Sequence, residues 1–128
     1  RDFWMPFACS VVSEKADEYF EMDAELSSYE YMTLCCMTTD KGKTDLQAAI
    51  HPYDNTCRPQ IVFRDKNKKY HELIKAFGDL TGVYGILNTS FNLHGLPIVS
   101  SIDDAVYVLR NSEIDGILFE DKLLMRQN

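Results

Sequence analysis

The sequence lacks the features that mark several large classes of protein. Its 128 residues contain no apolar run approaching the roughly 18 residues that a membrane-spanning helix needs. No initiator methionine, signal peptide or lipidation motif is present. The GxSxG, P-loop, HExxH and GxGxxG motifs are absent as well. We therefore expect a cytoplasmic protein whose chemistry does not depend on one of these common short motifs.

Basic residues are scarce, since 13 Lys and Arg face 20 Asp and Glu and give a net charge of -7. A general nucleic-acid binder needs a basic face, so this balance argues against one. The charge is uneven, with acids gathered in residues 14–30 and bases in residues 58–75. Two solvated faces are one interpretation. The local basic patch at 66–75 leaves contact with RNA or a partner protein open as another.

Cysteine is used sparingly and in no metal-binding pattern. Cys9, Cys35, Cys36 and Cys57 form no CxxC pair, and no Cys/His spacing suits zinc. We expect reduced, mostly buried thiols, with Cys35 and Cys36 on opposite faces of a strand. A second interpretation makes Cys57 a nucleophile, because a neighbouring arginine lowers a thiol pKa.

Length and composition fit one globular domain over residues 1–128, with 45% apolar residues. Because large aromatics follow Arg1 almost at once, we expect a piece of a longer chain. Hydrophobic periodicity and turn residues predict a mixed α/β (α+β) order. The expected strands are 7–12, 29–38, 48–51, 57–64, 84–87, 116–120 and 122–126. The expected helices are 14–21, 67–80 and 102–110, and 40–43 is expected to be a turn.

The helix at 67–80 has the clearest signal. Apolar residues recur along it at helical spacing, and Gly82 provides its end. His71 falls at the border of its polar face and is expected at the surface. The helix at 102–110 begins with a capping-box pattern of Ser101 and Asp104. Ser13 is expected to cap the helix at 14–21.

Two polar stretches carry more functional groups than a turn requires. The first, HPYDNTCRPQ at 51–60, includes Arg58, whose planar guanidinium suits phosphate or carboxylate. A structural arginine that ties down the loop is an equal alternative. The second, at 87–95, follows an apolar strand and gathers Asn88, Thr89, Ser90 and Asn92 before His94. Such a turn forms an anion-binding nest, or it only satisfies its own backbone.

Together these stretches resemble the C-terminal region of the NodU/CmcH-type O-carbamoyltransferases, a family that includes nodulation-factor, cephamycin and aminoglycoside carbamoyltransferases. The resemblance covers residues 1 to about 120 and rests on long, ordered motifs. They are WMPFA (4–8), HPYDNTCRPQ (51–60), FGDLTG (77–82), LNTSFNLHGLPIV (87–99) and DDA (103–105). The chain departs from the family at Leu96, where glutamate is usual, and at Cys9 and Ser101, where prolines are common.

The resemblance implies a YrdC-like fold, a mixed twisted sheet with about three helices packed on it. It implies two substrates, carbamoyl phosphate and ATP, which give a carbamoyl-adenylate. An N-terminal actin-like, Kae-type domain of the same chain would hold the metal and pass the carbamoyl group to a hydroxyl acceptor. This domain would need no cofactor or metal of its own, and alone it would be inactive.

Site roles also follow from the resemblance. Arg58 would bind the phosphate of carbamoyl phosphate or of the adenylate, and Ser90 and Asn92 would hold carbamoyl and phosphate oxygens. The remaining substrate-binding positions would be Arg1, Thr56, Gln60, Asn88, Thr89 and His94. Fixed donors and cations of this kind stabilise charge moving between phosphates without a protein nucleophile. The alternative is an anion-binding or regulatory module on the same scaffold, with catalysis lost because Leu96 replaces glutamate.

Overall fold

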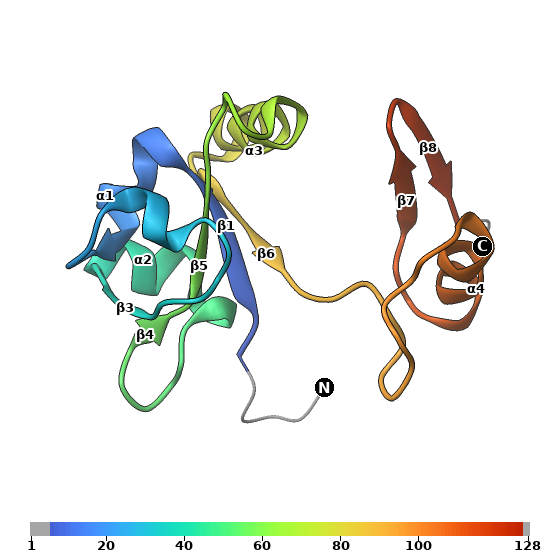
Figure 1. Ribbon diagram of the computed structural model, residues 1–128, viewed down its shortest axis with the longest axis horizontal. Coiled ribbons are helices and arrows are strands. Elements are labelled where there is room, and N and C mark those ends of the chain that lie inside the picture. The colour runs from blue at the N-terminus through green and yellow to red at the C-terminus, as the bar shows by residue number, and fades with distance from the viewer. Residues whose placement is uncertain (1–5, 127–128) are drawn as a thin grey trace. The chain divides into compact units, whose positions relative to one another are not determined.

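The computed structural model describes residues 6–126 and has the mixed α+β composition that the sequence predicts (Figure 1). Its strands form three small sheets. The chain divides into two compact units, and the boundary along the sequence falls between Thr89 and Ser90. Each unit is therefore described by itself. No helix among residues 6–126 is long and apolar enough to cross a membrane.

A three-stranded sheet forms the centre of the first unit. Its order is β5 (Pro59–Val62), β1 (Ala8–Val12) and β6 (Gly85–Asn88). β1 runs parallel to β5, with Ser10 opposite Gln60, and antiparallel to β6. All five residues of β1 are buried, as expected of a central strand covered on both faces. β1 and β6 confirm the predicted strands at 7–12 and 84–87 in position. The strand predicted at 57–64 is divided, because Cys57 belongs to a different strand, Thr56–Cys57, and only Pro59–Val62 forms β5.

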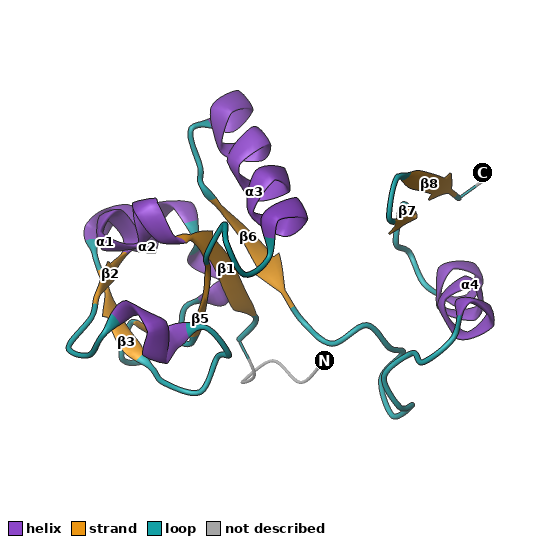
Figure 2. Cartoon of the chain, turned by 45° about the horizontal axis from the view of Figure 1, so that its top comes forward, coloured by secondary structure: helices purple, strands orange, loops and turns teal. Residues whose placement is uncertain are grey.

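Alternation along the strands assigns side chains to two faces of this sheet. On one face, Val12 and Val62 pack against Ile74 of α3 (Lys68–Thr81). The other face carries Cys9, Val11 and Ile61 into a larger core with Tyr19 and Tyr29. Figure 2 shows α3 lying along the sheet, apart from the shorter helices of the unit. Polar residues on the α3 face are thus separated from the larger core by the sheet.

The α3 helix matches its prediction closely. Asn67 caps it by accepting from the backbone N–H of Tyr70, and Gly82 ends it in the left-handed conformation at a φ of 81°. A residue with a Cβ is strained there, so glycine is the natural terminator. His71 is a correction to the sequence prediction, because it is buried with 2% exposure rather than at the surface.

A second, smaller sheet joins β2 (Phe20–Glu21), β3 (Cys36–Thr38) and β4 (Thr56–Cys57). The predicted strand at 29–38 is wrong over most of its length. A 3-10 helix at Leu26–Tyr29 and a turn with Met32 at a φ of 58° replace it. Cys36 is nevertheless buried and Cys35 exposed, so these neighbours face opposite ways as expected.

Two short helices also differ from the predictions. The expected turn at 40–43 is α2 (Asp40–Asp45), whose first turn Thr39 caps by accepting from Gly42 N–H. The predicted helix at 14–21 shortens to a 3-10 turn and α1 (Ala16–Tyr19), without a cap from Ser13. Gly42 allows α2 to pack closely against the end of α1, because a Cβ there would lie 2.3 Å from the backbone oxygen of Tyr19. The strand expected at 48–51 is mostly a 3-10 helix, Gln47–Ala49.

The second unit contains α4 (Ile102–Asn111) and the hairpin of β7 (Gly116–Phe119) and β8 (Lys122–Met125). The predicted capping box is present in full, since Ser101 and Asp104 each accept from the other's backbone N–H. The core of the second unit is small and consists of Ala105, Leu109 and Ile117 with partly buried aromatic and aliphatic neighbours.

Candidate functional site

A polar cluster lies on the α3 face of the central sheet, and two of its members are predicted site residues. Asn88 Nδ2 donates to Gln60 Oε1 at 2.8 Å and to Ser10 Oγ at 3.0 Å. Ser10 Oγ donates to the same Gln60 oxygen at 2.8 Å and accepts from the Tyr70 hydroxyl at 2.8 Å. Three strands and one helix thus converge on Ser10, which is fully buried.

This cluster fixes the orientation of the Gln60 amide. Its Oε1 accepts two hydrogen bonds, from Ser10 and from Asn88, which occupy both lone pairs of an amide oxygen. Its Nε2 is engaged by no other described residue. The two N–H groups of Gln60 are therefore the part of the side chain left to bind something else, and they can only donate.

Gln60 and Tyr70 also line a hollow of about 180 Å³. Lys66 lies on its wall and pairs with Glu30, which is nearly buried. That hydrogen bond raises the pKa of Lys66, so the ammonium stays charged at neutral pH. Glu30 lines the hollow as well, so its walls combine neutral hydrogen-bonding groups with one cation and the carboxylate that neutralises it.

Arg58 immediately precedes β5. Its side chain is exposed, and its guanidinium forms no hydrogen bond or ion pair with any residue from 6 to 126. Because Pro59 follows, the Arg58 backbone is restricted to extended conformations. Alternation then puts Arg58 on the same face as Gln60. The structural alternative, in which Arg58 ties down its own loop, has no contact among the described residues to support it.

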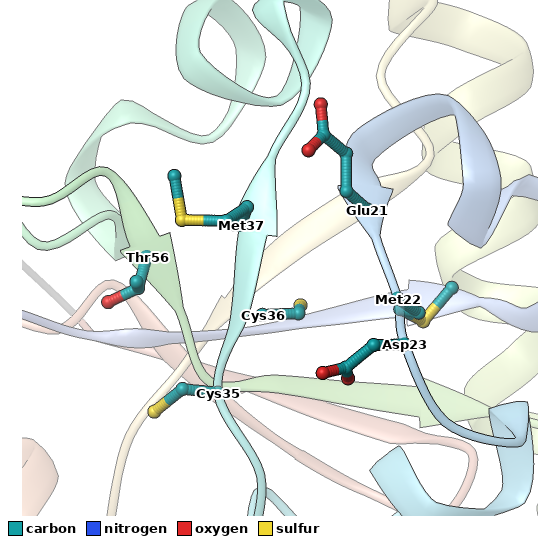
Figure 3. A pocket seen from close by; sticks show the side chains of 7 residues that line it. All are labelled: Glu21, Met22, Asp23, Cys35, Cys36, Met37 and Thr56. Carbon is teal, nitrogen blue, oxygen red and sulfur yellow. The ribbon is translucent and has the colours of Figure 1, made fainter.

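Thr56 lies apart from this cluster and lines a different hollow of about 430 Å³ (Figure 3). Two carboxylates and four sulfur side chains form the rest of the lining, namely Glu21, Asp23, Met22, Cys35, Cys36 and Met37. The Thr56 hydroxyl donates to Asp54 at 2.8 Å. Hydrogen bonds from Thr56 hold the pKa of Asp54 below its usual value, so another negative charge stands close by.

Cys36, which lines this second hollow, is a poor nucleophile. Burial, followed by the neighbouring Cys57, raises the pKa of Cys36 to about 12. A thiol with such a pKa carries almost no thiolate at neutral pH. Among the described residues, no group of three or more His, Cys, Asp and Glu is arranged to hold a metal ion.

The predicted anion-binding segment is divided between the two units. Asn88 belongs to β6, whereas Ser90, Asn92 and His94 belong to the second unit. Asn92 Nδ2 donates to the carbonyl oxygens of Leu93 at 3.1 Å and Leu96 at 2.7 Å. It thereby holds the turn that Gly95 makes at a φ of 83°. Its amide oxygen remains as an acceptor.

Ser90, His94 and Thr89 are exposed, and Arg1 lies outside the described residues. Ser10 and Tyr70 were missed by sequence reasoning. A serine inside an apolar strand and a tyrosine on a helix give no signal of their own, because only strand pairing brings them to Gln60.

Leu96 lines a further hollow of about 290 Å³ within the second unit. Its walls are mostly apolar and include Ile98 and Tyr107, which are exposed. Asp104 also lines it, but that carboxylate is engaged in capping α4. The leucine thus sits among apolar neighbours, and no basic residue lines this hollow.

Comparison with known proteins identifies the family. A family model described as carbamoyltransferase C-terminus matches residues 1–126. Nodulation protein NolNO of Sinorhizobium fredii is 36% identical over 99% of this chain, which covers 18% of that protein. Nodulation protein NolO of Bradyrhizobium diazoefficiens is 34% identical over 92% of this chain, which covers 21% of it. The uncharacterized protein MJ1058 of Methanocaldococcus jannaschii is 33% identical over 99% of this chain, which covers 20% of it.

The chain therefore spans about a fifth of the length of these relatives. The match covers both units and every polar stretch that the sequence singled out. The chain belongs to the carbamoyltransferase C-terminal family.

Proposed function

We propose that this domain binds carbamoyl phosphate and ATP and forms carbamoyl-adenylate. In the first step, water would release inorganic phosphate from carbamoyl phosphate and leave carbamate. In the second step, a carbamate oxygen would bond to the α-phosphorus of ATP, and pyrophosphate would leave. An N-terminal actin-like, Kae-type domain of the same chain, holding a metal, would then pass the carbamoyl group to a hydroxyl acceptor. The domain is YrdC-like under this proposal, and by itself it is inactive.

The observation that carries the proposal is the fixed Gln60 amide, together with the exposed Arg58 two positions earlier, whose guanidinium has no partner among residues 6–126. Ser10 and Asn88 occupy the Gln60 oxygen, so its N–H groups are left as donors. Arg58, on the same face, adds a charged fork that suits a phosphate. Donors that are already oriented stabilise developing negative charge without reorganising, which is what transfer between phosphates requires.

Electrostatics favour this cluster over the larger hollow. Glu21 and Asp23 line the larger one, and a phosphate placed there would meet two carboxylates of its own sign. At a few ångströms, each like-charge pair costs about 1 kcal/mol in water and about 4 kcal/mol near a protein surface. We therefore propose that Thr56 is the least engaged of the predicted substrate-binding residues.

Asn92 would contact the carbamoyl group rather than a phosphate. Both of its N–H groups are committed to the carbonyl oxygens of Leu93 and Leu96. The remaining Oδ1 accepts hydrogen bonds, which suits the NH₂ of a carbamoyl group and repels a phosphate oxygen. Ser90, exposed and with a hydroxyl that can both donate and accept, would serve either group, and His94 and Thr89 would line the ligand.

Replacing Gln60 with glutamate tests the binding part of the proposal. Gln60→Glu keeps the shape and the oxygen that accepts from Ser10 and Asn88, but turns the remaining donors into a negative acceptor. Carbamoyl phosphate affinity, measured by calorimetry on the full-length protein, should fall about 10-fold or more. Gln47→Glu makes the same charge change at an exposed 3-10 helix and should leave affinity unchanged. Equal affinity in both variants would refute the assignment.

The alternative function, a binding or regulatory module without catalysis, is favoured by Leu96 and its apolar surroundings. A leucine there supplies no charge to a reaction. Titration with ATP separates the two functions. Tight ATP binding without any formation of pyrophosphate would favour the module, whereas turnover dependent on carbamoyl phosphate would favour the enzyme.

A further inference from the structure

Two thiols meet in the larger core of the first unit. Cys9 Sγ lies 3.2 Å from Cys57 Sγ, although the residues are 48 positions apart in the chain. Cys9 is on β1 with 0% exposure, and Cys57 ends β4 with 2% exposure. Neither forms a disulfide, and both are free thiols. Nothing in the proposed carbamoyl chemistry uses this pair.

We propose that Cys9 and Cys57 are a redox modification site, at which a hydroperoxide converts the two thiols into a disulfide. A disulfide has an S–S length of about 2.05 Å, so sulfur atoms 3.2 Å apart need to approach by only roughly 1 Å. Two neighbouring strand ends can absorb such a movement, since β4 is only two residues long.

The surroundings give the two sulfurs different roles. Either sulfur can donate the hydrogen bond that joins Cys9 and Cys57. This hydrogen bond lowers the pKa of Cys57, burial opposes it, and the backbone and charge of Arg58 add to the lowering. The same hydrogen bond, with burial, raises the pKa of Cys9 well above its usual value. Cys57 directly precedes Arg58 and lies two residues after the exposed turn at 52–55, so we assign it as the thiolate that attacks first and Cys9 as the thiol that resolves.

Both steps balance. The Cys57 thiolate attacks one peroxide oxygen, the O–O bond breaks, and the leaving oxygen takes a proton, which gives a sulfenic acid and water or an alcohol. Cys9 sulfur then attacks the sulfenyl sulfur, the S–O bond breaks, and the departing hydroxyl leaves as water with the Cys9 proton. The protein loses two hydrogens and the hydroperoxide is reduced.

Access and selectivity follow from the local structure. Cys57 lies two residues after the exposed turn at 52–55, so a local opening of that turn uncovers it without unfolding the sheet. Cys36 Sγ only reaches the backbone oxygen of Cys57, at 3.9 Å, and does not compete as a thiolate. Cys35 is exposed and serves as an internal comparison.

Peptide mapping tests the proposal directly. Trypsin separates the cysteines into peptides 2–15, 16–41 and 44–64, because Pro59 protects the bond after Arg58. After the full-length protein is treated with stoichiometric hydrogen peroxide and its free thiols are blocked, peptides 2–15 and 44–64 should appear joined, two hydrogens lighter than their sum. Dithiothreitol should separate them again. Peptide 16–41 should remain unlinked.

Two controls make the result decisive. Cys57→Ser should abolish the linked peptide, and Cys9→Ala should leave a sulfenic acid on Cys57 that dimedone traps. Cys35→Ser should change neither outcome. Independently, peroxide should raise the melting temperature of the wild-type domain by at least about 5 °C, because a cross-link over a long loop restricts the unfolded chain. Absence of the 2–15/44–64 link in the folded wild-type protein would overturn the proposal.

Discussion

Asn88 and Gln60 illustrate how single residues acquire a role only through their partners. The sequence singled out both, yet could not choose between a turn that satisfies itself and a binding site. In the structure, each hydrogen bond from Asn88 Nδ2 goes to another strand, so the self-satisfying interpretation does not apply to this residue. Asn92 shows the opposite outcome, since its amide nitrogen binds its own turn. Local composition is the same in both cases, and tertiary pairing decides.

Ser10→Ala should destabilise the protein by roughly 1–3 kcal/mol, because it removes the buried hydroxyl that accepts from the partly buried Tyr70 and Asn88. The free energy of unfolding from urea titration measures this. Ser27→Ala, at an exposed position in a 3-10 helix, is the matched control and should cost little. If both substitutions cost the same, Ser10 does not hold the cluster together.

Glu14 gives a pH-dependent contribution to stability. Burial raises its pKa, but the hydrogen bond from His71 Nε2 at 2.8 Å and further polar contacts prevail and lower it. A carboxyl with a lowered folded-state pKa stabilises the fold fully above its unfolded pKa. That contribution disappears as the pH falls through the folded value. Urea titrations between pH 6 and pH 3 should therefore show a steeper loss of stability in wild type than in Glu14→Gln. Glu25→Gln, at an exposed carboxyl, should follow wild type, and identical slopes for all three proteins would contradict this.

At the scale of elements, predictions succeed where the signal is local. The α3 helix follows from helical periodicity and Gly82, and the capping box of α4 follows from Ser101 and Asp104. The strand prediction for 29–38 is wrong because the aromatic and sulfur-containing residues there follow no strand or helix period. The observed turn depends on Met32 in a left-handed conformation. The prediction of a turn in place of the helix at Asp40–Asp45 is wrong for a related reason. Gly42 suggests a turn in the sequence, but in the structure it is needed because the helix packs closely against the Tyr19 backbone.

Gly78→Ala should destabilise the protein even though alanine favours helices by up to about 1 kcal/mol over glycine. A Cβ at this position would lie 2.2 Å from the Tyr84 ring, which a hydrogen bond to Asp79 at 3.0 Å holds in place. In a Tyr84→Ala background the same change should become stabilising, because the obstruction is gone. Thermal unfolding of the four proteins of this cycle measures the coupling. A stabilising Gly78→Ala in wild type would refute this account of the α3 packing.

At the scale of the whole molecule, the chain is a family member that spans about a fifth of its relatives' length. The family match extends over residues 1–126 and includes both structural units, which composition alone did not separate. The acidic net charge of -7 makes local arginine and amide donors all the more necessary for an anionic substrate.

Carbamoyl-phosphate-dependent exchange of labelled pyrophosphate into ATP, in the full-length protein, tests the central claim most directly. Exchange should require carbamoyl phosphate and fall about 100-fold or more in Arg58→Ala. Arg64→Ala, whose guanidinium is engaged with Glu72 at 3.0 Å, should retain it. No exchange in the wild-type protein, or undiminished exchange in Arg58→Ala, would contradict the account.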